Sequence, residues 1–144
     1  MPLGGIDFTQ YERKLTLNII TMIQFSIEIL DTGIKDLEPI EEFGRFLAKD
    51  EGKKKPITSS QIRRFFGALK RIQADFDNLK GEIILLEPKL AYAVGKDDKN
   101  SKLEDFYKAL SPLIRNINEN EKRFRNFVSI VEAIVAYHKA QGGK

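Results

Sequence analysis

The sequence predicts an all-α protein, a compact single-domain bundle of about five to six helices with room for an extra N-terminal helix. Apolar residues recur at helical spacing through most of the chain. Two of these helical segments are preceded by a residue with a hydroxyl side chain, Thr58 and Ser101, as is common at helix N-termini. The 144 residues are 42% hydrophobic and 31% charged, which fits one globular domain with a real core rather than a disordered chain.

The first apolar stretch covers residues 9–31 and is predicted to be one long helix. The alternation from Leu15 to Ile19 also fits a strand, but no neighbouring segment offers a strand partner. The longest apolar run within it, Leu15–Leu30, is too short and too polar to span a bilayer. We therefore divide the chain into an N-terminal extension, residues 1–35, and a helical-bundle core, residues 36–144.

Gly33 separates the extension from a second helix, which is expected over residues 36–48 and is followed by a charged loop, residues 49–56. A third helix has a clear start. Thr58 matches the N-cap of a capping box, because Gln61 stands three residues after it and apolar residues follow at helical spacing.

The third helix is expected to continue to Leu79 and to break at Gly81. A fourth segment covers residues 82–94. Pro88 cannot sit unstrained in a helix interior, so it indicates either a kink or a new helix that begins there. Gly95 is expected just beyond the end of this helix, where a left-handed residue commonly closes the last turn.

The range Ser101–Glu104 matches a second capping box and predicts another helix, in which Pro112 indicates a kink or a boundary. The last helix is expected to begin within residues 118–121 and to end near Gly142. Its stretch Phe127–Tyr137 is apolar almost all round, which is typical of a helix at the centre of a bundle or at a subunit interface.

The residue types in the chain give little support for a catalytic site. The chain has no cysteine, which excludes disulfides, thiolate metal sites and cysteine nucleophiles. The lone histidine, His138, is interpreted as structural, and without a second histidine a zinc site is implausible. Paired carboxylates are adjacent in sequence and do not share a helix face. We expect no cofactor, no metal and no enzyme activity. The N-terminus lacks a signal-peptide pattern, so a cytoplasmic location follows by elimination.

Charge is distributed unevenly along the chain. Residues 1–50 hold five Lys and Arg against nine Asp and Glu, a balance of −4, whereas residues 51–144 hold 19 against 12, a balance of +7. This asymmetry fits either a polyanion that meets the second part or an ordinary excess on solvated faces.

Helical geometry favours the polyanion for the third helix. With successive residues 100° apart, Arg63, Arg64, Lys70 and Arg71 share an arc about 120° wide, opposite the apolar stripe, with Gly67 at its centre. An ordinary outer face usually mixes signs. Four cations on one arc repel each other, and a helical glycine costs about 1 kcal/mol against alanine. A nucleic-acid backbone lying across this face explains both features, because arginine suits phosphate.

Four further cations are candidates to extend this surface: Lys89, Lys96, Arg123 and Arg125. Each of them could instead be a solvated side chain. The aromatic residues fall on apolar faces, so base-stacking platforms are not indicated. We therefore expect contact with the backbone of a nucleic acid rather than recognition of its sequence.

Three stretches of the chain, in their order and spacing, resemble the small helical Csm subunit of type III-A CRISPR effector complexes. They are Ile57–Phe66, Pro88–Lys96, and Val131–Lys139 with the tail Gly142–Lys144. The resemblance covers about residues 37–144 and leaves the N-terminal stretch unmatched. Lys96 occupies the position at which the family usually has arginine. Lysine preserves the positive charge but lacks the planar guanidinium that can donate two hydrogen bonds to one phosphate.

The resemblance implies a non-catalytic RNA-binding subunit that stacks in several copies beside the guide RNA. Its partners would be the crRNA, the target RNA, the backbone and large subunits of the complex, and further copies of itself. The motif positions that would contact RNA are Arg63, Arg64, Lys89 and Lys96, whereas Lys70 and Arg71 come from the helical geometry alone.

A second interpretation remains open. The apolar last helix and the unmatched first stretch also fit a helical protein-interaction module that makes no direct RNA contact, for example a homodimer of the isolated protein.

Overall fold

The computed structural model describes residues 25–50, 52–97 and 100–144, which form helices joined by short connections, with no strand among them. The elements are α2 Ile29–Thr32, α3 Glu38–Ala48, α4 Ser59–Ala74, α5 Phe76–Leu79, the 3-10 helix η1 Lys80–Glu82, α6 Leu86–Lys96, α7 Leu103–Ile114 and α8 Glu121–Ala140. The prediction of an all-α single domain is confirmed.

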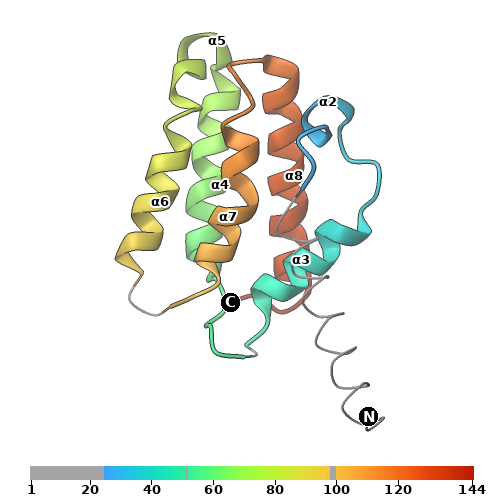
Figure 1. The fold of residues 1–144 in the computed structure, drawn as a ribbon, viewed down its shortest axis with the longest axis vertical. Helices are drawn as coiled ribbons and strands as arrows, with labels where there is room; N and C mark the ends of the chain where they lie inside the picture. Colours follow the sequence, from blue (N-terminus) through green and yellow to red (C-terminus); the bar gives the residue numbers. More distant parts are fainter. Residues whose placement is uncertain (1–24, 51, 98–99) are drawn as a thin grey trace, which may run out of the picture.

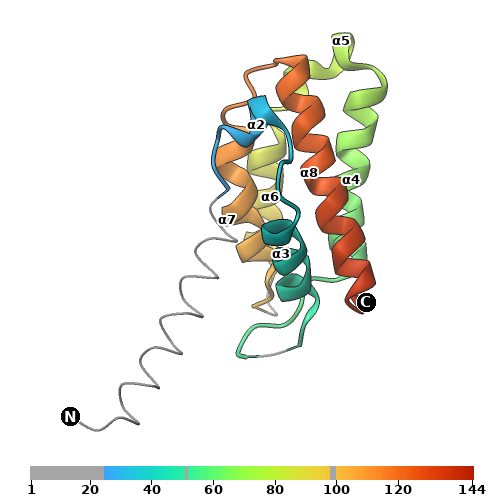
Figure 2. The ribbon, with the colours of Figure 1, turned by 90° about the vertical axis from the view of Figure 1, so that its right-hand side faces the viewer.

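Four helices, α4, α6, α7 and α8, run side by side along the long axis, and the chain alternates in direction from one to the next (Figure 1). The two N-terminal helices, α2 and α3, lie against α8 on the side away from α6 (Figures 1 and 2). Helix α8 packs against α2, α3 and α4, and α6 packs against α7. The predicted central position of the last helix is therefore confirmed.

The core is organised around aromatic side chains of three helices. Phe65 of α4 meets Phe106 of α7 and Phe127 of α8 in edge-to-face geometry, with ring centroids 5.5 and 6.4 Å apart. Helix α3 approaches α8 closely because Gly44 presents no side chain to Tyr137. No helix in the described ranges is both long and apolar enough to cross a membrane.

The first predicted helix lies mostly outside the described residues. In the part that is described, residues 25–28 are not helical and only the short α2 follows, so one continuous helix to residue 31 is wrong. Gly33 ends α2 with a φ of 74°, a left-handed conformation that glycine adopts without strain. The second helix, α3, matches its prediction closely.

The capping box at the start of α4 is confirmed. The Thr58 hydroxyl accepts from the Gln61 backbone N–H at 3.1 Å, and the Gln61 side chain accepts from the Thr58 N–H at 2.9 Å. The predicted end is wrong. Helix α4 stops before Asp75, whose backbone leaves the helical region at φ −142° and whose carboxylate accepts from the Asn78 amide. Gly81 lies inside η1.

At α6, Pro88 occupies the first turn, so the prediction of a new helix is confirmed and a kink is not found. The position of Gly95 was predicted wrongly, because it lies inside α6. The helix continues to Lys96, whose ammonium lies 5.3 Å from the ring centroid of Tyr92 one turn earlier and favours a longer last turn.

The second predicted capping box does not form. The Ser101 hydroxyl accepts from the Leu103 N–H and donates to Asp97, while the Glu104 carboxylate accepts from the Lys54 ammonium at 2.9 Å. The ion pair with the distant Lys54 thus replaces the capping-box bond in which the Glu104 side chain would accept from the Ser101 backbone N–H. Pro112 lies in the last turn of α7 and marks a boundary.

Helix α8 begins as expected, because the Asn120 side chain accepts from the Arg123 N–H at 2.9 Å. At its other end the Gly143 N–H donates to the His138 carbonyl at 2.8 Å and the Gly142 N–H donates to the Lys139 carbonyl at 3.1 Å. This is a Schellman motif, and Gly142 supplies its left-handed residue with a φ of 90°.

Three buried polar side chains tie the elements together, and each has partners. His138 bonds through Nε2 to the Ile57 carbonyl at 2.9 Å, which supports its structural interpretation. The Lys102 ammonium donates to two carbonyls at the end of α3 at 2.7 and 2.8 Å. Glu87 of α6 is bonded to side chains at α7.

The Glu87 carboxylate accepts from the Ser111 hydroxyl and from Arg115 Nε, both at 2.7 Å, and from the Tyr107 hydroxyl at 3.3 Å. These bonds, with the Ser111 hydroxyl first and the Arg115 guanidinium next, outweigh burial and lower the pKa of Glu87. The buried carboxylate therefore holds α6 against α7, which leaves the opposite side of α6 turned toward α4.

Candidate nucleic-acid interface

The basic face predicted for the third helix is present on α4. Arg63, Arg64, Lys70 and Arg71 are all exposed, and so is Gly67 between them. The opposite stripe is buried in the core and consists of Ile62, Phe65, Leu69 and Ile72. The face predicted from a rotation of 100° per residue is therefore the exposed face of α4, although exposure alone does not identify a ligand.

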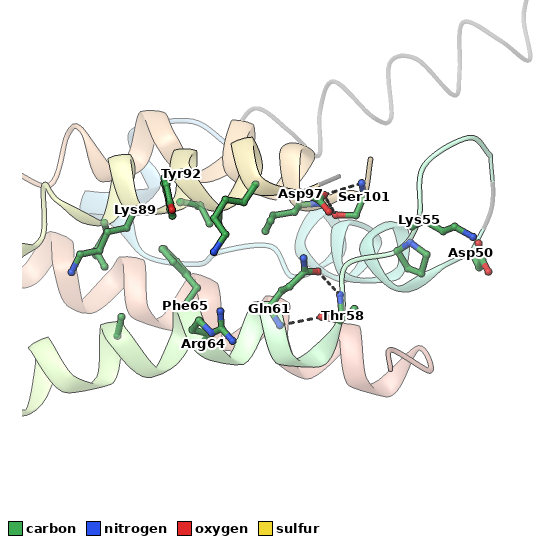
Figure 3. Close-up of a pocket in the computed structure, with 17 residues that line it drawn as sticks. Asp50, Lys55, Thr58, Gln61, Arg64, Phe65, Lys89, Tyr92, Asp97 and Ser101 are labelled. Atoms are coloured by element: carbon green, nitrogen blue, oxygen red, sulfur yellow. Dashed lines mark hydrogen bonds between the residues drawn. The ribbon is translucent and has the colours of Figure 1, made fainter. Parts of the chain in front are cut away.

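A groove of about 1070 Å³ lies between α4 and α6. It exists because α4 packs against α8 while α6 packs against α7, so these two helices do not close on each other. Figure 3 shows Arg64 and Phe65 on one side and Lys89 and Tyr92 on the other. The apolar residues that line it are Pro56, Phe65, Ala68, Leu86, Leu90, Ala93 and Leu103.

Cations stand on both sides of this groove. Arg64 comes from α4, Lys89 and Lys96 come from α6, and Lys55 comes from the loop before α4. Lys89 and Lys96 are seven residues apart, about two helical turns, and therefore lie on one face of α6. Three predicted site residues, Arg64 of α4 and Lys89 and Lys96 of α6, are thus brought to one groove.

Most of these cations lack an internal counter-charge. Within the described part of the chain, the side chains of Lys55, Arg64 and Lys89 form no hydrogen bond or ion pair, and neither does that of Arg63 on the outer face of α4. Two acidic residues, Asp50 and Asp97, line only the end of the groove that Lys55 and Ser101 also line, where Asp97 accepts from the Ser101 N–H at 3.0 Å (Figure 3). The middle of the groove is left cationic.

Two of the predicted cations on α4 have partners beside the groove. Lys70 donates to the Gln73 side chain at 2.9 Å on its own helix, and Arg71 forms an ion pair with Glu82 of η1. Both remain exposed, but Glu82 offsets the charge of Arg71, so of the two only Lys70 adds net positive charge to the face of α4. Arg63 and Lys70 do not line the groove itself.

The two predicted cations of α8 are not brought to the groove. Arg123 forms a two-pronged ion pair with Asp31 of α2 at 2.8 and 3.2 Å and also donates to the Asn116 carbonyl at 2.8 Å. The hydrogen bond from Arg123 lowers the pKa of Asp31. This arginine fastens α2 to α8. Arg125 is exposed and is not among the groove residues.

Tyr92 is the residue that the sequence interpretation missed. Its side chain is 68% exposed, more than any other large hydrophobic residue that the structure describes. The prediction that aromatic residues lie on apolar faces is therefore wrong at this position. The available signal was its spacing, because Tyr92 stands three residues after Lys89 and four before Lys96, on the same face of α6.

Metal ligands do not gather in any part of the chain that the structure describes, where no group of three or more His, Asp and Glu could hold an ion.

Comparison with known families places residues 34–144 in a match with the model described as Csm2 Type III-A. The matched range includes both helices of the groove and all eight predicted site residues. Neither the curated proteins nor the solved structures give a match to the chain.

Proposed function

The chain belongs to the Csm2 type III-A family and is therefore a small subunit of the type III-A CRISPR Csm complex, and we propose that it holds the crRNA–target RNA backbone in the groove between α4 and α6. In this role it contacts RNA without reading its sequence and stabilises the assembled complex. The other Csm subunits are its partners, and we propose that further copies of itself lie beside it.

The observation that carries this proposal is the meeting of Arg64, Lys89 and Lys96 at one groove. Like charges from two helices repel each other, and a polyanion relieves that repulsion. The guanidinium of Arg64 can donate two hydrogen bonds to one phosphate, and lysines attract phosphate as point charges. Arg63 and Lys70 extend the positive potential along α4 and favour the approach of RNA.

We propose that the subunit is not the catalyst. The family is a structural subunit family of the complex. The lone histidine, His138, is buried and bonded to the Ile57 carbonyl. The buried Glu87 is bonded by two side chains of α7 and by Arg115, the residue that follows its last turn. Neither group is presented to a substrate, which supports a holding role rather than cleavage.

The test is a salt titration of RNA binding by the assembled complex that carries Arg64→Ala and Lys89→Ala together. Each lost phosphate contact of a duplex flattens the slope of log affinity against log salt by about 0.9, so the double variant is expected to lose about 1.8 for each copy of the subunit in the complex. Lys122→Ala is the matched control, because Lys122 is an exposed cation of α8 near Asp31 of α2. An unchanged affinity and slope in the double variant would contradict the proposal.

A homodimer of the isolated subunit is the second candidate. Ile84 and Leu85, adjacent residues between η1 and α6, are 51% and 48% exposed and form a small apolar surface. The apolar character of α8 no longer supports it, because Ile130 is fully buried inside the subunit. Light scattering at several concentrations, with Ile84→Asp for comparison, would decide. A monomer at every concentration contradicts the dimer.

A further inference from the structure

We propose that the groove between α4 and α6 binds an unpaired nucleotide of RNA, with its base stacked on Tyr92 and its phosphates held by the flanking cations. The stacked nucleotide belongs to a single strand, or is unpaired within the crRNA–target RNA whose backbone the groove holds. This inference rests on the proposed RNA-binding function and adds a contact to a base face.

The first observation is the exposure of the Tyr92 ring. A tyrosine usually buries its ring and leaves its hydroxyl in water. Here the side chain is 68% exposed on α6 and lies beside an apolar groove. Its contact with described residues is the Lys96 ammonium, 5.3 Å from the ring centroid. A long, flexible lysine covers one side of the ring and can move aside for a phosphate.

The second observation is the apolar lining. Phosphates require cations and gain nothing from an apolar surface, yet Phe65, Leu90 and Ala93 line the groove between the charged side chains. The volume of about 1070 Å³ lies just above the range of pockets that accept small organic ligands, about 300–1,000 Å³. An aromatic base with an attached sugar combines the apolar and polar surfaces that such a groove matches.

The third observation is the placement of charge around the ring. Lys89 and Lys96 stand on either side of Tyr92 along α6, and their Cα atoms are separated by about 10.5 Å along the helix axis. A stacked strand carries one charge about every 3.4 Å, so this span faces about three phosphates. Arg64 supplies a cation from the opposite side of the groove (Figure 3).

Base pairing decides which form of RNA can use this site. In an A-form duplex the base faces are covered by neighbouring pairs, and proteins reach the backbone and the 2′-hydroxyls. A ring can stack only on a base that has left the helix or was never paired. Tyr92 therefore contributes to binding of single strands and contributes nothing to binding of a continuous duplex.

The experiment compares the full chain with its Tyr92→Ala and Tyr92→Phe variants. The probe is a single-stranded RNA that contains 2-aminopurine, a base whose fluorescence is quenched when it stacks on an aromatic ring, and the comparison is a blunt RNA duplex. We expect Tyr92→Ala to weaken single-strand binding at least about fivefold and to abolish the quenching. Tyr92→Phe should keep both, and duplex affinity should not change.

Thermal melts monitored by circular dichroism check that the exposed position leaves folding intact. The variant Arg64→Ala with Lys89→Ala separates the two proposals. If that variant loses RNA while Tyr92→Ala binds as the wild type does, the stacking inference fails and the backbone proposal stands. If neither change affects binding, or the full chain binds no RNA at low salt, both fail. If Tyr92→Ala keeps RNA binding but blocks entry into the complex, the groove is a protein-docking site and the inference is overturned.

Discussion

The glycines of α3 and α4 predict opposite effects of the same substitution. At Gly44 of α3, an added Cβ would lie 2.6 Å from the Tyr137 Cβ and 3.0 Å from the His138 nitrogen. These atoms belong to the rigid part of α8, so the two helices would have to separate. At Gly67 of α4, an added Cβ meets nothing within 4 Å.

The magnitudes follow from two terms. Alanine is favoured over glycine in a helix interior by about 1 kcal/mol, and this term applies at both positions. Gly44→Ala adds overpacking, which costs about 3 kcal/mol at the upper end of the usual range. We expect Gly44→Ala to lower the free energy of unfolding by about 2 kcal/mol and Gly67→Ala to raise it by about 1 kcal/mol.

Urea unfolding of the full chain, followed by far-UV circular dichroism, measures both changes. The slope of free energy against urea should be the same in both variants, so that shifts of the midpoint report stability alone. The reasoning is refuted if Gly44→Ala unfolds at the wild-type midpoint or above it, or if the two variants shift in the same direction.

Three further predictions concern other contacts of the same helices. Glu87→Gln should lower the free energy of unfolding by about 1 kcal/mol at neutral pH, since it removes the charge that Ser111 and Arg115 stabilise. The pKa of Glu87 is lowered in the folded state, so its contribution to stability is present above about pH 4.3 and is lost as pH falls through the folded pKa. If the urea midpoints of the wild type and Glu87→Gln differ by the same amount at pH 7 and at pH 3, this reasoning is disproved. Gly143→Ala should cost about 1–2 kcal/mol, because its Cβ would lie 2.2 Å from the His138 ring. That cost should largely vanish in a His138→Ala background, and an undiminished cost in the double-mutant cycle would show that the ring is not responsible. Gly67→Ala should weaken RNA binding by the assembled complex despite its greater stability, and wild-type affinity would show that no phosphate approaches the helix there.

Local signals were sufficient where short-range bonds decide the structure. The start of α4 depends on Thr58 and Gln61, which satisfy each other's backbone groups without help from the rest of the chain. The hydroxyl at Ser101 carries the same kind of signal, but Glu104 instead pairs with Lys54, which lies 50 residues before it in the chain. A tertiary ion pair outweighed the local pattern, and the spacing within the chain does not reveal it.

The candidate site was predictable in its parts but not in its arrangement. The helical periodicity of α4 identified Arg63 and Arg64 as exposed, because the apolar residues define the opposite face of the helix. The groove itself depends on how α6 turns, which Glu87 determines through partners on α7. The ion pair between Arg123 and Asp31 joins residues 92 positions apart, so sequence spacing did not show that this arginine is already engaged.

The most direct test of the central claim is to crosslink RNA to the assembled complex and identify the attached peptides of this subunit. RNA that carries 4-thiouridine, irradiated in the intact complex and analysed by mass spectrometry, reports contact without any mutation. We expect the crosslinks to fall in residues 61–71 of α4 and 86–97 around α6. Crosslinks confined to α3 or α8, or the absence of any crosslink on this subunit, would contradict the claim that the groove between α4 and α6 holds the RNA.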